Sequence, residues 1–262
     1  MTATAPSPTP ETTNPRRRRL MIGGGILAVI LIVAGVGLWW FFRDDAPAEV
    51  DLATAVEQVT SGDEASTGDA PAGGGDVEID GAWAVDTSIG DFDFETATGS
   101  FAGFRVEEEL STIGSTTAVG RTGGVAGTLE IEGTTLSSAE ISADLSQITT
   151  NDSRRDSRAR GALDTDNFPE ATFVLAEPVD FGAAAAEGEA VSVTATGDLT
   201  IKGVTQRVEF PLQAQLSEGV VVVVGSLDVT FSDFDVEVPS APIVVSVDDE
   251  GVLELQLLFT KA

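Results

Sequence analysis

Residues 191–216 decide the fold, and their sequence is VSVTATGDLTIKGVTQRVEFPLQAQL. Apolar or small residues alternate with polar residues on both sides of Lys202-Gly203, a pair that is typical of a two-residue hairpin turn. Gln206 is the one residue that departs from this alternation. With the turn at this pair, both apolar sets fall on one face of an antiparallel hairpin. The facing pairs are then Ile201 and Val204, Gly197 and Val208, Ala195 and Phe210, and Val193 and Leu212.

The same period of two recurs in other parts of the chain. It is found in residues 125–131, 139–145 and 253–259. Turn signals in which glycine follows another residue occur at Glu132-Gly133, Glu187-Gly188, Glu218-Gly219 and Glu250-Gly251. One short helix is predicted between Asn151 and Leu163, after an Asn or Asp cap. Many half-buried strands joined by tight turns predict an all-β antiparallel sandwich or barrel.

The composition excludes several classes of protein. The 262-residue chain has a formal net charge of −29, and so acidic a protein has no basic surface with which to bind nucleic acid. It contains no Cys, no His and no Tyr, which excludes disulfides, thiolate chemistry, Ser-His-Asp triads and most zinc sites. We therefore expect no catalytic residue, no metal and no cofactor, and we expect that the protein is not an enzyme.

A membrane anchor is predicted near the N-terminus. The uncharged run from Leu20 to Phe42 is long enough to cross a bilayer as a helix. Arg16–Arg19 precede it, aromatic residues occupy 39–42, and two aspartates follow Arg43, so the N-terminus is expected in the cytoplasm. A cleaved signal peptide is the alternative, but its core is shorter and ends in small residues. We expect a single-pass protein of the cell membrane with an extracytoplasmic C-terminal domain.

Four regions follow from this pattern. Residues 1–19 are predicted to be a disordered cytoplasmic tail, 20–42 a transmembrane helix, 43–80 a flexible acidic linker and 81–262 a β-barrel domain. Within the linker, Val50, Leu52, Val56 and Val59 have the spacing of a short helix. Residues 1–43 have a net charge of +4 and the remainder a net charge of −33. The Arg-rich, Lys-poor composition is also typical of GC-rich bacterial genomes.

Three features of the outer domain carry competing interpretations. The inward faces mix bulky residues with small ones such as Gly127 and Gly197, which fits either a ligand cavity or a tapered, filled core. The basic cluster at 154–160 could meet a phosphate or carboxylate headgroup, or could neutralise the acidic residues around it. The acidic stretch 164–167 lacks the ligand series of a calcium loop, and no pair of carboxylates stands out for glycoside hydrolysis.

Five segments together resemble the YceI-like family of lipocalin-like, polyisoprenoid-binding proteins. They are Gly81–Ser88 (GAWAVDTS), Val125–Leu129 (VAGTL), Thr150–Asp156 (TNDSRRD), Phe168–Phe173 (FPEATF) and Gly197–Thr205 (GDLTIKGVT). They occur in the order and spacing of the family, over about residues 80–262. Members often have a His soon after the Arg-Asp pair, whereas Ser157 and Arg158 occupy that stretch here. Any role of that His cannot be transferred to this chain.

The resemblance implies an eight-stranded antiparallel barrel with one short helix, which encloses an apolar tunnel for a long isoprenoid or another lipid. Inward-facing apolar positions are the expected ligand contacts, namely Trp83, Phe104, Val106, Ile141, Phe173, Leu199, Phe210 and Phe231. Arg155, Arg158 and Arg160 are the candidates for contact with a headgroup.

Three functions are compatible with these features. The first is a membrane-tethered protein that carries, stores or sequesters an apolar lipid, with that lipid and the membrane as its partners. The second is a non-catalytic envelope scaffold whose barrel is filled by its own side chains. The third is an enzyme that uses carboxylates. The presence of a bound lipid distinguishes the first from the second.

Overall fold

The computed structural model describes residues 46–62, 79–110, 114–237 and 244–262. They belong to one compact unit, Ala46–Ala262. The predicted cytoplasmic tail (1–19) and transmembrane helix (20–42) lie outside the described residues. In the part of the chain that is described, no helix combines the length and apolar character needed to cross a bilayer.

The hairpin predicted for residues 191–216 consists of β8 (Val191–Ile201) and β9 (Val204–Ser217). All four predicted facing pairs are confirmed. Lys202 and Gly203 both have positive φ, 51° and 77°, as the tightest hairpin turns require because their twist matches that of the strands. The departure at Gln206 places this residue opposite Leu199.

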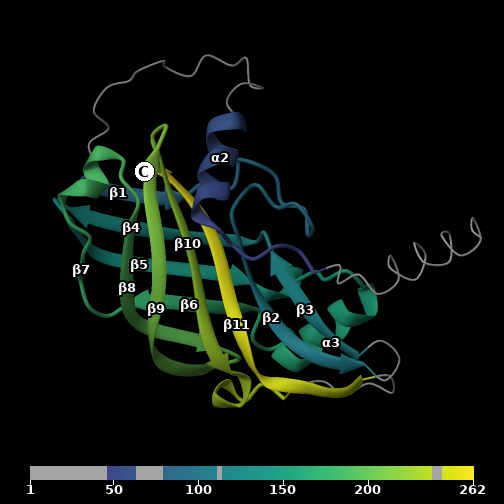
Figure 1. The fold of residues 1–262 in the computed structure, drawn as a ribbon. Coiled ribbons are helices and arrows are strands. Elements are labelled where there is room, and N and C mark those ends of the chain that lie inside the picture. Colours follow the sequence, from purple (N-terminus) through teal and green to yellow (C-terminus); the bar gives the residue numbers. More distant parts are fainter. Residues whose placement is uncertain (1–45, 63–78, 111–113, 238–243) are drawn as a thin grey trace, which may run out of the picture. The chain divides into compact units, whose positions relative to one another are not determined.

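Eight strands close into an antiparallel barrel (Figure 1), which confirms the predicted architecture. Around the barrel they are β1 (Gly81–Val85), β4 (Val125–Glu132), β5 (Thr135–Asp144), β6 (Glu170–Leu175), β8, β9, β10 (Val220–Thr230) and β11 (Val244–Lys261). The barrel closes where β11 pairs with β1, through Val85 and Phe259 among others. Closure leaves no open edge along this set of strands.

Three further strands extend the sheet. β2 (Phe101–Leu110) pairs with the long β11, and β3 (Gly114–Thr122) pairs with β2, as Figure 1 shows. The short β7 (Val179–Asp180) pairs with β5. β11 can pair with both β1 and β2 because its 18 residues reach well past the end of β1.

The predicted helix is α3 (Ser153–Leu163). The Asp152 carboxylate caps it by accepting hydrogen bonds from the backbone N–H groups of Arg154 and Arg155. The helix ends at Asp164, whose backbone is left-handed (φ 51°). The cap and the stop signal together explain why this segment is helical in an otherwise β-rich chain.

The prediction of one helix needs a correction, because a second one, α2 (Leu52–Gly62), lies in the segment expected to be a flexible linker. Leu52, Ala55 and Val59 are buried against the outer face of the barrel. They pack on alternate residues of β10, namely Val220, Val222 and Val224. The apolar spacing within 50–59 therefore marks a real helix, which tertiary contacts stabilise.

The chain just before α2 is held to the barrel by a buried ionic group. Glu254 accepts a hydrogen bond from Nε of Arg105 and another from Nε of Arg121, both at 2.8 Å. The same two guanidinium groups donate to the backbone carbonyls of Pro47 and Ala48. This Arg-Glu-Arg group fixes the segment at 47–48 on β2, β3 and β11.

Candidate functional site

The inward faces of the barrel strands enclose two adjoining apolar cavities. One has a volume of about 130 Å³ and reaches Val179 of β7 and Phe181, so we name it the β7 lobe. The other has a volume of about 120 Å³ and reaches Leu163 of α3, so we name it the α3 lobe. Of the side chains that line the β7 lobe, only that of Gln215 is polar, and its amide donates to the carbonyl of Gly188.

Four side chains border both lobes and form a waist between them. They are Ile141 of β5, Phe173 of β6, Phe210 of β9 and Leu255 of β11. The rings of Phe173 and Phe210 meet edge to face, with their centroids 6.1 Å apart and an interplanar angle of 83°. Because the four residues come from strands around the barrel, the waist lies across the lumen.

Glycines on neighbouring strands provide the space for three of these side chains. A Cβ atom on Gly197 would collide with the ring of Phe173. A Cβ atom on Gly225 would come too close to Phe210, and one on Gly127 too close to Ile141. Gly127, Gly197 and Gly225 therefore lack a side chain where a large side chain of the neighbouring strand packs against the backbone.

Six of the eight predicted ligand contacts line these lobes. Ile141, Phe173 and Phe210 belong to the waist. Leu199, Phe104 and Phe231 line the α3 lobe, where the two phenyl rings meet edge to face at 6.4 Å and 84°. The structure thus brings residues from six strands and turns to one lumen, and their contact with a ligand stays a prediction.

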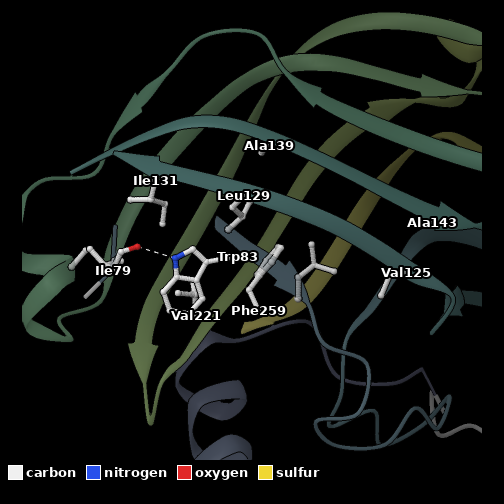
Figure 2. Packing of buried hydrophobic residues seen from close by; sticks show 11 residues of the cluster. Ile79, Trp83, Val125, Leu129, Ile131, Ala139, Ala143, Val221 and Phe259 are labelled. Atoms are coloured by element: carbon white, nitrogen blue, oxygen red, sulfur yellow. Dashed lines mark hydrogen bonds between the residues drawn. The ribbon is translucent and has the colours of Figure 1, made fainter. Parts of the chain in front are cut away.

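The other two predicted contacts, Trp83 and Val106, do not line either lobe. Trp83 is fully buried in the cluster with Leu129 and Phe259, and its indole N–H donates to the carbonyl of Ile79 at 2.8 Å (Figure 2). Val106 is buried and borders a separate depression that both polar and apolar residues line. Alternation identifies the face of a strand, but it does not identify how far the lumen extends along it.

The three candidate headgroup arginines have different surroundings. Arg155 forms an ion pair with Glu108 at 2.6 Å and also donates to the side chain of Asn151. Arg160 is half-buried and donates to the carbonyl of Ile148, a residue that lines the α3 lobe. Arg158 is exposed. Neutralisation within the protein thus accounts for Arg155, and the structure leaves Arg158 facing solvent.

A short turn positions one wall of the α3 lobe. Leu145 and Ile148 both line the lobe; Leu145 is the first residue of the 3₁₀ turn η2 (Leu145–Gln147), and Ile148 directly follows it. Hydrogen bonds from the side chains of Gln147 and Ser146 lower the pKa of Asp144, which caps this turn. The carboxylate is therefore charged at neutral pH and keeps the turn in place.

Sequence reasoning missed most of the β7 lobe. Its additional wall residues include Leu212, Val221, Val223, Leu255 and Leu257. The signal was present, since Val220–Val224 is an uninterrupted apolar run, which indicates a strand buried on both faces. Val221 and Val223 border the lumen, while their neighbours lie under α2.

No metal site accompanies the cavity in the part of the chain that the structure covers, where no group of three or more Asp or Glu residues is arranged to hold a metal ion. In the acidic stretch 164–167, which lacks the ligand series of a calcium loop, Asp164 accepts hydrogen bonds from the side-chain amide of Asn167. This aspartate therefore serves the turn that ends α3.

Comparison with one solved structure supports the fold, and a second structure shows a weaker similarity. A polyisoprenoid-binding domain from Saccharophagus degradans, implicated in plant cell wall breakdown, matches with a TM-score of 0.51 and 19% identity, over 70% of this chain and 99% of that one. BcnA from Burkholderia cenocepacia matches with a TM-score of 0.46 and 21% identity, over 60% of this chain and 95% of that one. Among curated proteins, no significant match was found.

A comparison with protein-family models identifies the family. The model of the YceI-like domain matches residues 83–259, which is more than half of the chain. This range runs from within β1 to near the end of β11 and includes nearly all of the residues that line the two lobes. The chain therefore belongs to the YceI-like family.

Proposed function

We propose that this protein is a membrane-tethered, extracytoplasmic binding protein that holds the chain of an apolar lipid, a polyisoprenoid, inside its barrel. The proposal is one of binding, as in a carrier or store, and not of catalysis. The single observation that carries it is the pair of adjoining cavities inside the barrel, lined almost wholly by apolar side chains.

The chemistry of the lining selects the ligand. A polar headgroup inside the β7 lobe would lose its water and find one side-chain amide, already engaged, in return. A hydrocarbon chain loses nothing there and gains about 0.8 kcal/mol for each methylene group removed from water. We infer that the chain lies inside and that the polar end stays outside the lobes.

The choice of a polyisoprenoid rests on two supports. The chain belongs to the YceI-like family, and the Saccharophagus degradans domain that shares its fold is described as polyisoprenoid-binding. The tether rests on the sequence of residues 20–42, whose length and flanking charges are those of a membrane-spanning helix. A tether would keep the cavity close to the bilayer that holds such lipids.

A photoreactive lipid tests the proposal. The full-length chain, in detergent micelles, is irradiated with a geranylgeraniol analogue that carries a diazirine at the far end of its chain, and the labelled residues are identified by mass spectrometry. We expect labels on residues that line the lobes. An excess of unlabelled geranylgeraniol should remove them, and an excess of ethanol, which has too little hydrocarbon to fill a lobe, should not.

Two variants of β9 provide the matched comparison. Phe210→Glu places a charge at the waist and should abolish labelling, whereas Gln213→Glu places the same charge on the exposed face of the same strand and should leave it unchanged. If Phe210→Glu does not fold, Phe210→Trp takes its place. This variant keeps the site apolar, and we expect it to weaken labelling. Absence of competable labelling in the unaltered chain would refute the proposal in favour of a filled scaffold.

A further inference from the structure

The lumen is divided, and the division has a consequence for the length of the bound chain. Each lobe has a volume of 120–130 Å³. An engineered apolar cavity of about 150 Å³ holds one benzene molecule, which has six carbons. By this comparison each lobe has room for about five carbons, or about one isoprene unit. A chain of four units therefore needs both lobes and extends beyond them.

Passage between the lobes leads through the waist. The side chains that border both lobes are Ile141, Phe173, Phe210 and Leu255. Two of them are in edge-to-face contact, and this contact must be broken if a chain is to pass between the rings. Such a pair contributes a modest stabilisation beyond its buried area, which is enough to bias binding but not enough to block it.

The packing of the Phe173 ring against Gly197 and of the Phe210 ring against Gly225 restricts how the two rings can move. Each ring already lies against the backbone of the neighbouring strand, since a Cβ atom at either glycine would fall within contact distance of it. The rings therefore have no space to retreat into the wall, and they yield by turning apart. The waist is therefore closed while the two rings are in contact, and a lipid chain must separate them in order to pass.

We propose that Phe173 and Phe210 determine chain length in this barrel: with the rings in contact each lobe takes about one isoprene unit, and a longer chain binds only by parting them. This inference rests on the proposed function, because it concerns the same cavity. Removal of one ring should therefore favour long chains selectively. Short chains, which fit within one lobe, should bind as before.

The test compares two prenols on three forms of the full-length chain. The alcohol 3-methyl-2-buten-1-ol has one isoprene unit and geranylgeraniol has four, and each is used to displace the diazirine probe. In Phe173→Ala, we expect the affinity for geranylgeraniol to rise about three- to tenfold. The affinity for 3-methyl-2-buten-1-ol should stay within about twofold of that of the unaltered chain.

Phe231→Ala is the matched control. Phe231 is also a lobe-lining phenylalanine in an edge-to-face pair, with Phe104, and it also rests on a glycine, Gly251. It borders only the α3 lobe, so its removal enlarges that lobe without joining the two. We expect no change in the ratio of the two affinities in this variant. Phe173→Leu, a smaller perturbation, serves if Phe173→Ala does not fold.

The outcomes separate the two claims. If the unaltered chain binds neither prenol, the proposed function itself fails. If it binds both, and if Phe173→Ala and Phe231→Ala change the two affinities in the same ratio, lipid binding stands and the waist is overturned. A selective gain for geranylgeraniol in Phe173→Ala alone supports the waist.

Discussion

At the scale of single residues, the buried Arg-Glu-Arg group is the feature that could least be predicted from the sequence. Arg105 and Arg121 come from the consecutive strands β2 and β3, and Glu254 comes from β11, more than 130 residues further along the chain. The side chain of Glu254 is 1% exposed, and it is the shared partner of both arginines. No local pattern signals such a group, because its members are paired by barrel topology.

The carboxylate at this position has a large predicted effect on stability. Glu254→Gln leaves two buried guanidinium groups without their counter-charge and should lower the free energy of unfolding by about 3–5 kcal/mol. Asp198→Asn breaks the exposed ion pair with Arg207 and should cost less than about 1 kcal/mol. Urea unfolding followed by circular dichroism measures both. Equal losses in the two variants would contradict this account.

At the scale of elements, alternation predicted the hairpin of β8 and β9 down to its register, because one buried face allows only one alignment. The helix at 153–163 was equally accessible, since its cap is local. The docking of α2 was not, because it depends on contacts with β10. The five consecutive valines of β10 indicated that something covers their outer face, but not what.

The packing of α2 can be tested with one substitution made at two positions. Ala55 is fully buried against the barrel, whereas Ala53 is exposed on the same helix. Ala55→Asp buries an unpaired charge and should release α2 from the barrel. The backbone amides of residues 52–62 and of β10, which α2 covers, should then exchange faster. Ala53→Asp should leave exchange unchanged. Slow exchange of 52–62 in Ala55→Asp would show that α2 does not depend on this contact.

The cap of α3 predicts a dependence on pH. Hydrogen bonds from the backbone N–H of Arg154, and then of Arg155, together with the charges of these arginines, lower the pKa of Asp152 below its usual 3.8. In the unfolded chain the carboxylate takes up its proton first as the pH falls. The stabilisation is therefore complete above about pH 3.8 and is lost as the pH falls through the lower pKa of the folded state.

Asp152→Asn isolates this effect, because an asparagine still caps a helix but does not titrate. Thermal unfolding of the two proteins should differ in its slope with pH below pH 3.8 and not above pH 5. Parallel curves at low pH would mean that the cap contributes no pH dependence.

At the scale of the whole molecule, the barrel was predictable because many short patterns agree, and because five segments together resemble one family. The division of the lumen was not predictable. It depends on which inward residues share a level of the barrel, and on glycines that let Phe173 and Phe210 lie against the wall. Val106 illustrates the same limit, since its strand continues past the end of the lobes.

The apolar lining of the lobes also leads to a prediction about how lipid affinity depends on ionic strength. The lobes are apolar, so the affinity for geranylgeraniol should change little between low and high ionic strength. If Arg158 contacts a headgroup, the affinity for geranylgeranyl phosphate should fall as salt is added, and Arg158→Ala should remove that fall. Binding of the two lipids with the same salt dependence would exclude the headgroup contact.

The most direct test of the central claim is the lipid that the protein itself retains. The 262-residue chain is purified from detergent-treated cells that produce it, and the lipids that co-purify are extracted and identified by mass spectrometry, with Phe210→Glu and Gln213→Glu treated in parallel. The account predicts an isoprenoid lipid with the unaltered chain and with Gln213→Glu, and none with Phe210→Glu. An equal amount of every lipid in all three samples would contradict it.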